Sequence, residues 1–139
     1  MRHRQTERGY IVRLERGEPL METLRHFIHA NEIQSATLTG LGAVCNSRLG
    51  FYDLETRSYV EKSVPEDCEL VSLVGNISYF EATPVIHVHA TLGTRDFQAL
   101  AGHLFDTECS VTVELHIDVY QNRIDRKPDD NTGLNLMDL

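Results

Sequence analysis

Hydrophobic and polar residues alternate along much of this chain, which is the period-two pattern of strands with one face buried. The pattern is clear between Gly9 and Gly17 and clearest from Cys109 to Tyr120. In the second of these segments, the apolar residues that point one way are Val111, Val113, Leu115, Ile117 and Val119. We expect this apolar face to contribute to the core of the protein.

One segment follows a helical period instead. Pro19 suits the first position of a helix, and the segment extends to Asn31. Its apolar residues recur every three or four positions and are Met21, Leu24, Phe27 and Ile28. We expect Leu24, Phe27 and Ile28 to pack against the apolar face of the last strand. A second, short helical segment is expected from Asp96 to Leu100, ended by Gly102.

Several shorter apolar runs complete the pattern. Strands are expected over residues 35–39, 44–52, 57–64, 69–74, 77–80 and 85–92. The glycine-bearing residues 40–42 are expected to form a turn, and Gly75-Asn76 to interrupt a strand. About seven strands with one or two helices and short loops predict an α+β fold with a largely antiparallel sheet. The predicted domain spans residues 9–120, and a polar tail follows over 121–139.

Length and composition agree with one compact domain. The chain has 139 residues, of which 41% are hydrophobic and 24% charged. No apolar run reaches the roughly 20 residues that span a bilayer, and the basic N-terminus has no apolar stretch behind it. We therefore expect a cytoplasmic protein with no membrane partner. The three cysteines, Cys45, Cys68 and Cys109, lack CxxC spacing and are expected to be free thiols.

The charge balance disfavours nucleic acid as a partner. Thirteen Lys and Arg face twenty-one Asp and Glu, so the formal net charge is −8. Affinity for nucleic acids depends on cationic side chains that neutralise phosphates, and the chain offers only Arg2, Arg4 and Arg8 as a local basic group. No strand is followed by a GxxxxGK[ST] or GxGxxG motif, so a nucleotide-binding fold is not indicated either.

Histidines provide the candidate chemistry. His87 and His89 lie two residues apart in a predicted strand and therefore project from the same face. His103 follows in a predicted loop or helix end and could complete a three-histidine site for a divalent metal. Imidazole is the commonest zinc ligand, and three protein ligands leave a coordination position open, as in catalytic zinc sites. The alternative is a pair of histidines hydrogen-bonded at a polar cleft or a subunit interface, without a metal.

The order of motifs resembles the PPC (plants-and-prokaryotes conserved) domain. The matching blocks are Gly40–Val44, Leu49–Asp53, Glu69–Ile77, Pro84–Ala90, Gly102–Leu104 and the strand with Val111, Thr112 and Glu114. The resemblance implies an α+β fold, a homotrimer and the DNA-binding label that bacterial members share with plant AT-hook proteins. The AT-hook core Arg-Gly-Arg-Pro is absent here. The implied fold is also similar to that of acetolactate decarboxylase, a zinc enzyme with a His-x-His pair.

Three hypotheses about function remain open. The leading one is a homotrimeric metal-binding protein with an unassigned small ligand or partner, and DNA binding by the isolated domain is disfavoured. The second is a zinc-dependent lyase or hydrolase acting on a small carbonyl substrate. It requires a general acid or base, for which Glu114 is the first candidate and Glu69 the second. Asn76 and Ser78 are expected to line the same cleft. The third hypothesis is a DNA-binding protein.

Overall fold

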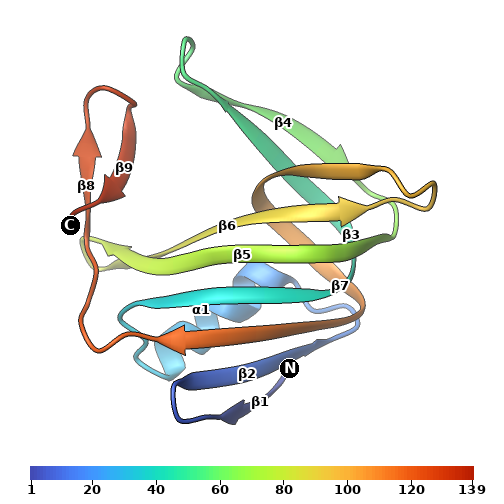
Figure 1. The fold of residues 1–139 in the computed structure, drawn as a ribbon, viewed down its shortest axis with the longest axis horizontal. Coiled ribbons are helices and arrows are strands. Elements are labelled where there is room, and N and C mark those ends of the chain that lie inside the picture. The colour runs from blue at the N-terminus through green and yellow to red at the C-terminus, as the bar shows by residue number, and fades with distance from the viewer.

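A computed structural model describes residues 1–139. Seven strands form one sheet in the order β1-β2-β7-β6-β5-β3-β4, and β8 and β9 form a separate hairpin (Figure 1). The elements are β1 (Arg2–Gln5), β2 (Gly9–Glu15), α1 (Leu20–Ala30), β3 (Ala36–Asp53), β4 (Ser58–Val64), β5 (Cys68–Phe80), β6 (Thr83–Gly93), β7 (Ala99–Val119), β8 (Arg126–Asp129) and β9 (Leu134–Met137). All neighbouring strands of the sheet are antiparallel. One helix with a mostly antiparallel sheet confirms the predicted α+β class.

Two long strands give the sheet its shape. β7 pairs with β6 near its start, with β2 over its second half, and with β3 along much of its length. Because β3 also pairs with β5, and β5 with β6, the four strands form a closed circuit of pairings. This circuit brings the beginning of β7 back beside β6, where the candidate histidines lie.

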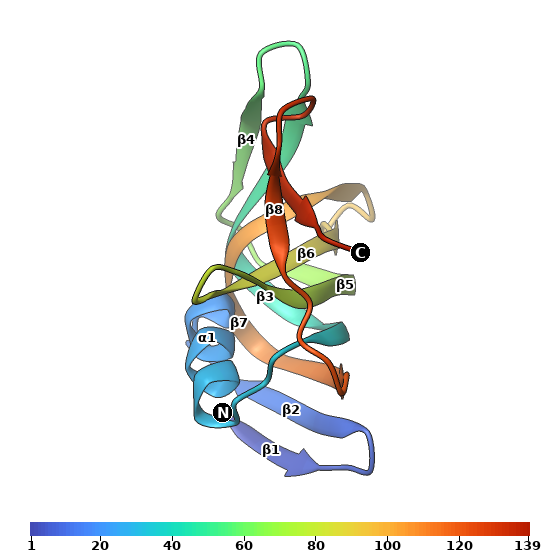
Figure 2. The same cartoon turned by 90° about the vertical axis from the view of Figure 1, so that its left-hand side faces the viewer.

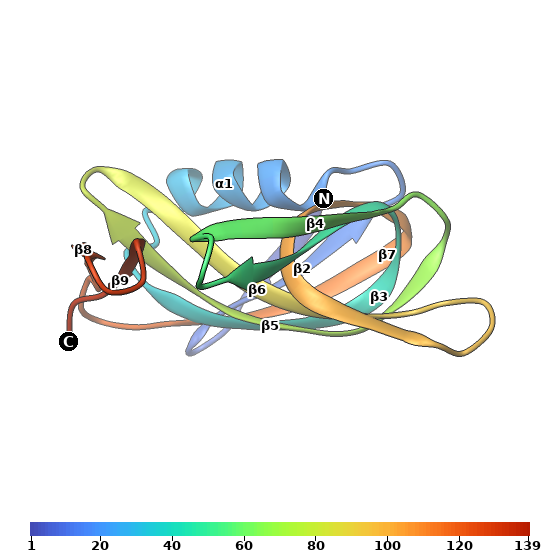
Figure 3. The ribbon, with the colours of Figure 1, turned by 90° about the horizontal axis from the view of Figure 1, so that it is seen from above.

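The helix α1 covers one face of the sheet, as Figures 2 and 3 show from two directions. Its buried residues are Leu20, Met21, Leu24, Phe27 and Ile28. They join Val113, Leu115 and Ile117 of β7 in one cluster of 26 buried residues, which confirms the predicted core. Pro19 precedes the helix in an extended conformation that suits the entry to the first turn.

Two predicted breaks are wrong, because the strands continue through them. Residues 40–42 lie inside β3, where a register shift takes the place of the expected turn. A Cβ on Gly42 would lie 2.1 Å from the carbonyl oxygen of Thr112, so glycine permits the close crossing of β3 and β7. Gly75-Asn76 likewise lies within β5.

A further register shift in β7 leaves Val111 exposed, whereas the alternation predicted that it faces the core.

The predicted helical segment from Asp96 to Leu100 is also wrong. Residues 94–98 form the tight turn that joins β6 to β7, and Gly102 lies inside β7. The backbone N–H of Phe97 donates to the Thr94 carbonyl, and that of Gln98 to the Thr94 hydroxyl. Phe97 adopts a positive φ of 59°, which ends any helical path. The turn makes β6 and β7 a hairpin.

The segment after Gln121 folds as the β8–β9 hairpin, which stands beside the sheet (Figure 1). The Tyr79 N–H of β5 donates to the Ile124 carbonyl at 2.9 Å and anchors the base of the hairpin. At its tip, the Tyr52 hydroxyl donates to the Thr132 carbonyl at 2.6 Å. The hairpin is therefore anchored to the sheet at its base and at its tip, and it lies beside the strands that carry the histidines.

The sheet face opposite the helix carries exposed apolar side chains. Leu41, Val71, Val74 and Val111 are each more than half exposed. No helix covers this face (Figure 3).

The single helix α1 is too short and not apolar enough to cross a bilayer.

Candidate metal centre

The three candidate histidines come from the β6–β7 hairpin. In β6, His87 and His89 alternate with the buried Ile86 and Val88, so the apolar residues enter the core and the imidazoles project from the opposite face. His103 of β7 is the direct cross-strand partner of His89. Strand alternation and hairpin register together place all three side chains on one surface.

The structure brings the three imidazoles together. One ring nitrogen from each of His87, His89 and His103 lies within 4.8 Å of the other two. The ring centroids are 5.3 Å apart for His87 and His89, 5.4 Å for His87 and His103, and 5.5 Å for His89 and His103. Three ring nitrogens this close can be bridged by a single ion, because each zinc–nitrogen bond is about 2.0–2.1 Å long.

Two aromatic rings pack against the imidazole of His103. Its ring centroid lies 5.1 Å from that of Tyr59 in β4 and 4.9 Å from that of Phe105 in β7. A Cβ on Gly50 would lie 2.5 Å from Phe105 and 2.8 Å from Tyr59, so glycine makes room for both rings. Fixed neighbours of this kind limit the rotation of the imidazole and hold it ready for a ligand.

The environment of His103 fits a metal ligand. Its Nδ1 atom is buried and has no hydrogen-bond partner. An unsatisfied buried polar atom costs about 1–3 kcal/mol, and coordination of a metal ion through Nδ1 would remove that cost. The donor set of three imidazole nitrogens matches the ligands that zinc prefers. The residues present therefore fit a divalent metal.

Electrostatics keep two of the imidazoles in the form that binds metals. Burial, followed by the positive charge of Arg126 and the neighbouring histidines, lowers the pKa of His87 to about 4. Burial and the nearby His89 also lower the pKa of His103. Only neutral imidazole can coordinate a metal, so both residues are available as ligands at neutral pH.

A residue that the sequence did not single out lies beside this site. Arg126, at the start of β8, donates from Nε to the Ser78 hydroxyl at 2.6 Å and from one terminal nitrogen to Asn76 Oδ1 at 3.0 Å. Asn76 is the cross-strand partner of His87, so the guanidinium reaches the edge of the histidine cluster. Asn76 therefore lies beside the histidine cluster, whereas the Ser78 side chain is fully buried and serves as an acceptor for the guanidinium.

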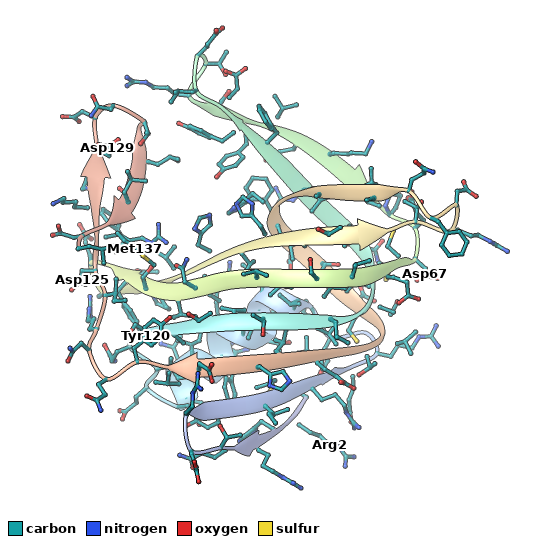
Figure 4. All side chains as sticks on the ribbon, viewed as in Figure 1. Arg2, Asp67, Tyr120, Asp125, Asp129 and Met137 are labelled. Carbon is teal, nitrogen blue, oxygen red and sulfur yellow. The ribbon has the colours of Figure 1, made fainter.

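Neither candidate carboxylate lies with the histidines in this chain. Glu114 pairs with Arg13 of β2 and Leu41 of β3, on the second half of β7 beyond its bend. Glu69 lines a separate pocket of about 500 Å³ at the opposite end of the sheet from the β8–β9 hairpin. Asp67, which lines the same pocket, is labelled there in Figure 4.

Comparisons with known proteins agree with this geometry. The sequence profile of the Plants and Prokaryotes Conserved (PCC) domain matches residues 1–121. The chain belongs to this family. PCC and PPC are two abbreviations for the same domain, so the resemblance seen in the motifs is confirmed. Among curated proteins, none matches the chain.

Solved structures resemble this PCC-domain protein along almost its whole length. A candidate DNA-binding protein from Bacteroides thetaiotaomicron is 31% identical with a TM-score of 0.95, and the alignment covers 99% of this chain and 96% of that one. A metal-containing protein from Archaeoglobus fulgidus is 32% identical with a TM-score of 0.86, covering 99% of both chains. A PPC protein from Pyrococcus horikoshii is 28% identical with a TM-score of 0.86, covering 99% and 95%.

Proposed function

We propose that this PCC-domain protein binds one divalent metal ion per chain, with zinc favoured, through His87, His89 and His103. The observation that carries the proposal is the convergence of three ring nitrogens within 4.8 Å, one of them from a residue with a buried nitrogen that lacks a partner. The metal content of the Archaeoglobus fulgidus relative supports it. Bound zinc would supply a Lewis acid that polarises a carbonyl or acidifies a bound water.

The same geometry favours a binding role over catalysis by the single chain. A lyase or hydrolase would require an acid or base within hydrogen-bonding reach of the substrate. Glu114 and Glu69 lie apart from the histidines in this chain. A catalytic role for Glu114 therefore stays a prediction. It requires that a second copy of the chain place its Glu114 beside the histidines.

Calorimetric titration of zinc into metal-free protein tests the proposal. We expect one zinc per chain for the wild type and loss of that binding in His103→Ala. His116→Ala is the matched control, because His116 is exposed in the same strand and pairs with Thr39, away from the cluster. Equal zinc binding by wild type and His103→Ala would refute the three-histidine site.

We also propose that the protein forms a homotrimer. The exposed apolar residues Leu41, Val71, Val74 and Val111 on the uncovered sheet face support association. Closed symmetry would bury them without open-ended growth, and the family resemblance favours three subunits over two. A cleft between subunits would also enclose a small ligand more completely than one sheet face does.

Two structurally similar proteins are described as DNA-binding, which favours the DNA-binding hypothesis. The charge distribution of this chain opposes it. Of the N-terminal basic residues, Arg2 pairs with Glu15 and Arg8 with Asp118. Arg13 also pairs with Glu15. These contacts place carboxylates beside two of the three arginines of the local basic group, and the net charge of −8 further opposes the approach of a phosphate backbone. Metal binding is therefore the function that this geometry supports best.

A further inference from the structure

Arg126 has a positive charge that no acidic side chain of the protein neutralises. Its side chain is half-buried, and none of the salt bridges in the structure includes it. Its three hydrogen bonds go to neutral oxygens, namely Ser78 Oγ, Asn76 Oδ1 and the Asn135 carbonyl. A partly buried charge without a counter-charge is costly, so this arrangement favours an anion from outside the chain.

The neighbouring cations of the same hairpin are different. Arg123 pairs with Asp125, and Lys127 pairs with Asp138. Figure 4 shows Asp125 near the base of the hairpin. The chain thus supplies carboxylates for the cations that flank Arg126 and none for Arg126 itself.

The position of Arg126 connects this cation to the candidate metal centre. The guanidinium donates to Asn76, and Asn76 and His87 are direct cross-strand partners whose Cα atoms lie about 4.5–5.5 Å apart in such pairs. Both side chains project from the same sheet face. A small molecule that fills the space over this pair would therefore meet the guanidinium on one side and the histidine cluster on the other.

We propose that Arg126 and the three-histidine site together bind a small organic carboxylate. The carboxylate pairs with the guanidinium, and a second oxygen on the adjacent carbon faces the cluster formed by His87, His89 and His103. This inference rests on the proposed metal binding and names the ligand class of that site. It assigns a role to a residue beyond the part of the chain that the family profile matches, which ends at residue 121.

The unused donors of Arg126 favour a carboxylate. A guanidinium has five N–H groups, and the three hydrogen bonds leave one N–H on each terminal nitrogen. Two N–H donors on adjacent nitrogens match the two oxygens of a carboxylate. Phosphate sites usually add a helix N-terminus or a nest of backbone N–H groups, and the single helix α1 lies on the other face of the sheet.

The test uses the full chain loaded with zinc and measures ligand affinity by isothermal titration calorimetry. The probes are pyruvate, which carries a second oxygen beside its carboxylate, acetate, which does not, and inorganic phosphate. We expect pyruvate to bind most tightly. The variant Arg126→Gln should weaken pyruvate binding by about tenfold or more, because a charge-assisted pair is lost, while the zinc content stays at one per chain.

The control is Arg57→Gln, which removes the contact from Arg57 to the Asn131 carbonyl at the tip of the same hairpin. It should leave pyruvate affinity unchanged. An equal loss in both variants would assign Arg126 to hairpin docking only and overturn the proposal. Unchanged affinity in Arg126→Gln, or tighter binding of phosphate than of pyruvate, would also overturn it. Wild-type protein that takes up no zinc would instead refute the metal site itself.

Discussion

His89 and His103 face each other across the β6–β7 hairpin as direct register partners, with ring centroids 5.5 Å apart. The turn at Thr94–Gln98 sets this register, because its length determines which residues of the two strands lie opposite each other. A shift by one residue would turn His103 toward the core. The geometry of the candidate metal centre therefore depends on a turn that contains none of its ligands.

The double substitution His87→Ala, His89→Ala should abolish zinc binding and leave the fold largely intact. Both imidazoles project away from the core, and the packing of β6 comes from the buried Ile86, Val88 and Leu92. Zinc per chain, measured by elemental analysis, should fall from about one to the background level. Loss of the folded state in circular dichroism would contradict this separation of ligands from core.

Leu115→Ala should destabilise the protein by about 2–5 kcal/mol, because Leu115 is fully buried between the sheet and α1. Urea unfolding measures the change. Thr112→Val in the same strand is the comparison, since the Thr112 hydroxyl is buried without a hydrogen-bond partner. Replacing an unsatisfied hydroxyl by a methyl group should leave stability unchanged or raise it. A similar loss in both variants would show that the two positions are equally packed.

The metal-free protein should become less stable as the pH falls from about 6.5 to about 4. The pKa of His87 is about 4 in the folded chain, against an ordinary value of 6.5. As the pH falls, the unfolded chain therefore binds the proton first, which favours unfolding, and the full stability is present above pH 6.5. Urea unfolding at several pH values measures this slope, which should be smaller in His87→Ala. An NMR titration of His87 centred near pH 6.5 would contradict the expectation.

Val111→Asp should convert the proposed homotrimer to monomers. Val111 is 69% exposed on the uncovered sheet face, and a carboxylate there would face an apolar partner surface. Light scattering should give about three times 15.8 kDa for the wild type and about 15.8 kDa for the variant. Leu54→Asp, in the exposed loop between β3 and β4, should remain trimeric. A wild-type protein that stays monomeric as its concentration rises would refute the assembly.

Local patterns explain which parts of the structure the sequence could predict. The alternation around His87 and His89 and the helical spacing of Leu24 and Ile28 are properties of single elements, and both were correct. The continuation of β3 through Gly42 was missed, because that glycine serves a close crossing with β7 instead of a turn. Local patterns carry no information about such long-range contacts.

Arg126 shows the same limit at the candidate site. In the sequence it belongs to a polar segment that ends the chain, and no nearby motif indicates a role. Its position depends on the docking of the β8–β9 hairpin through Tyr79 and Tyr52, which are distant in the sequence. Only the folded chain brings its guanidinium to Asn76.

Crystallography of the zinc-loaded protein at the zinc absorption edge tests the central claim most directly. We predict one anomalous peak per chain, with ring nitrogens of His87, His89 and His103 about 2.0–2.1 Å away. A peak bound by His87 and His89 without His103, or no peak at this cluster in protein soaked with zinc, would contradict the three-histidine metal centre.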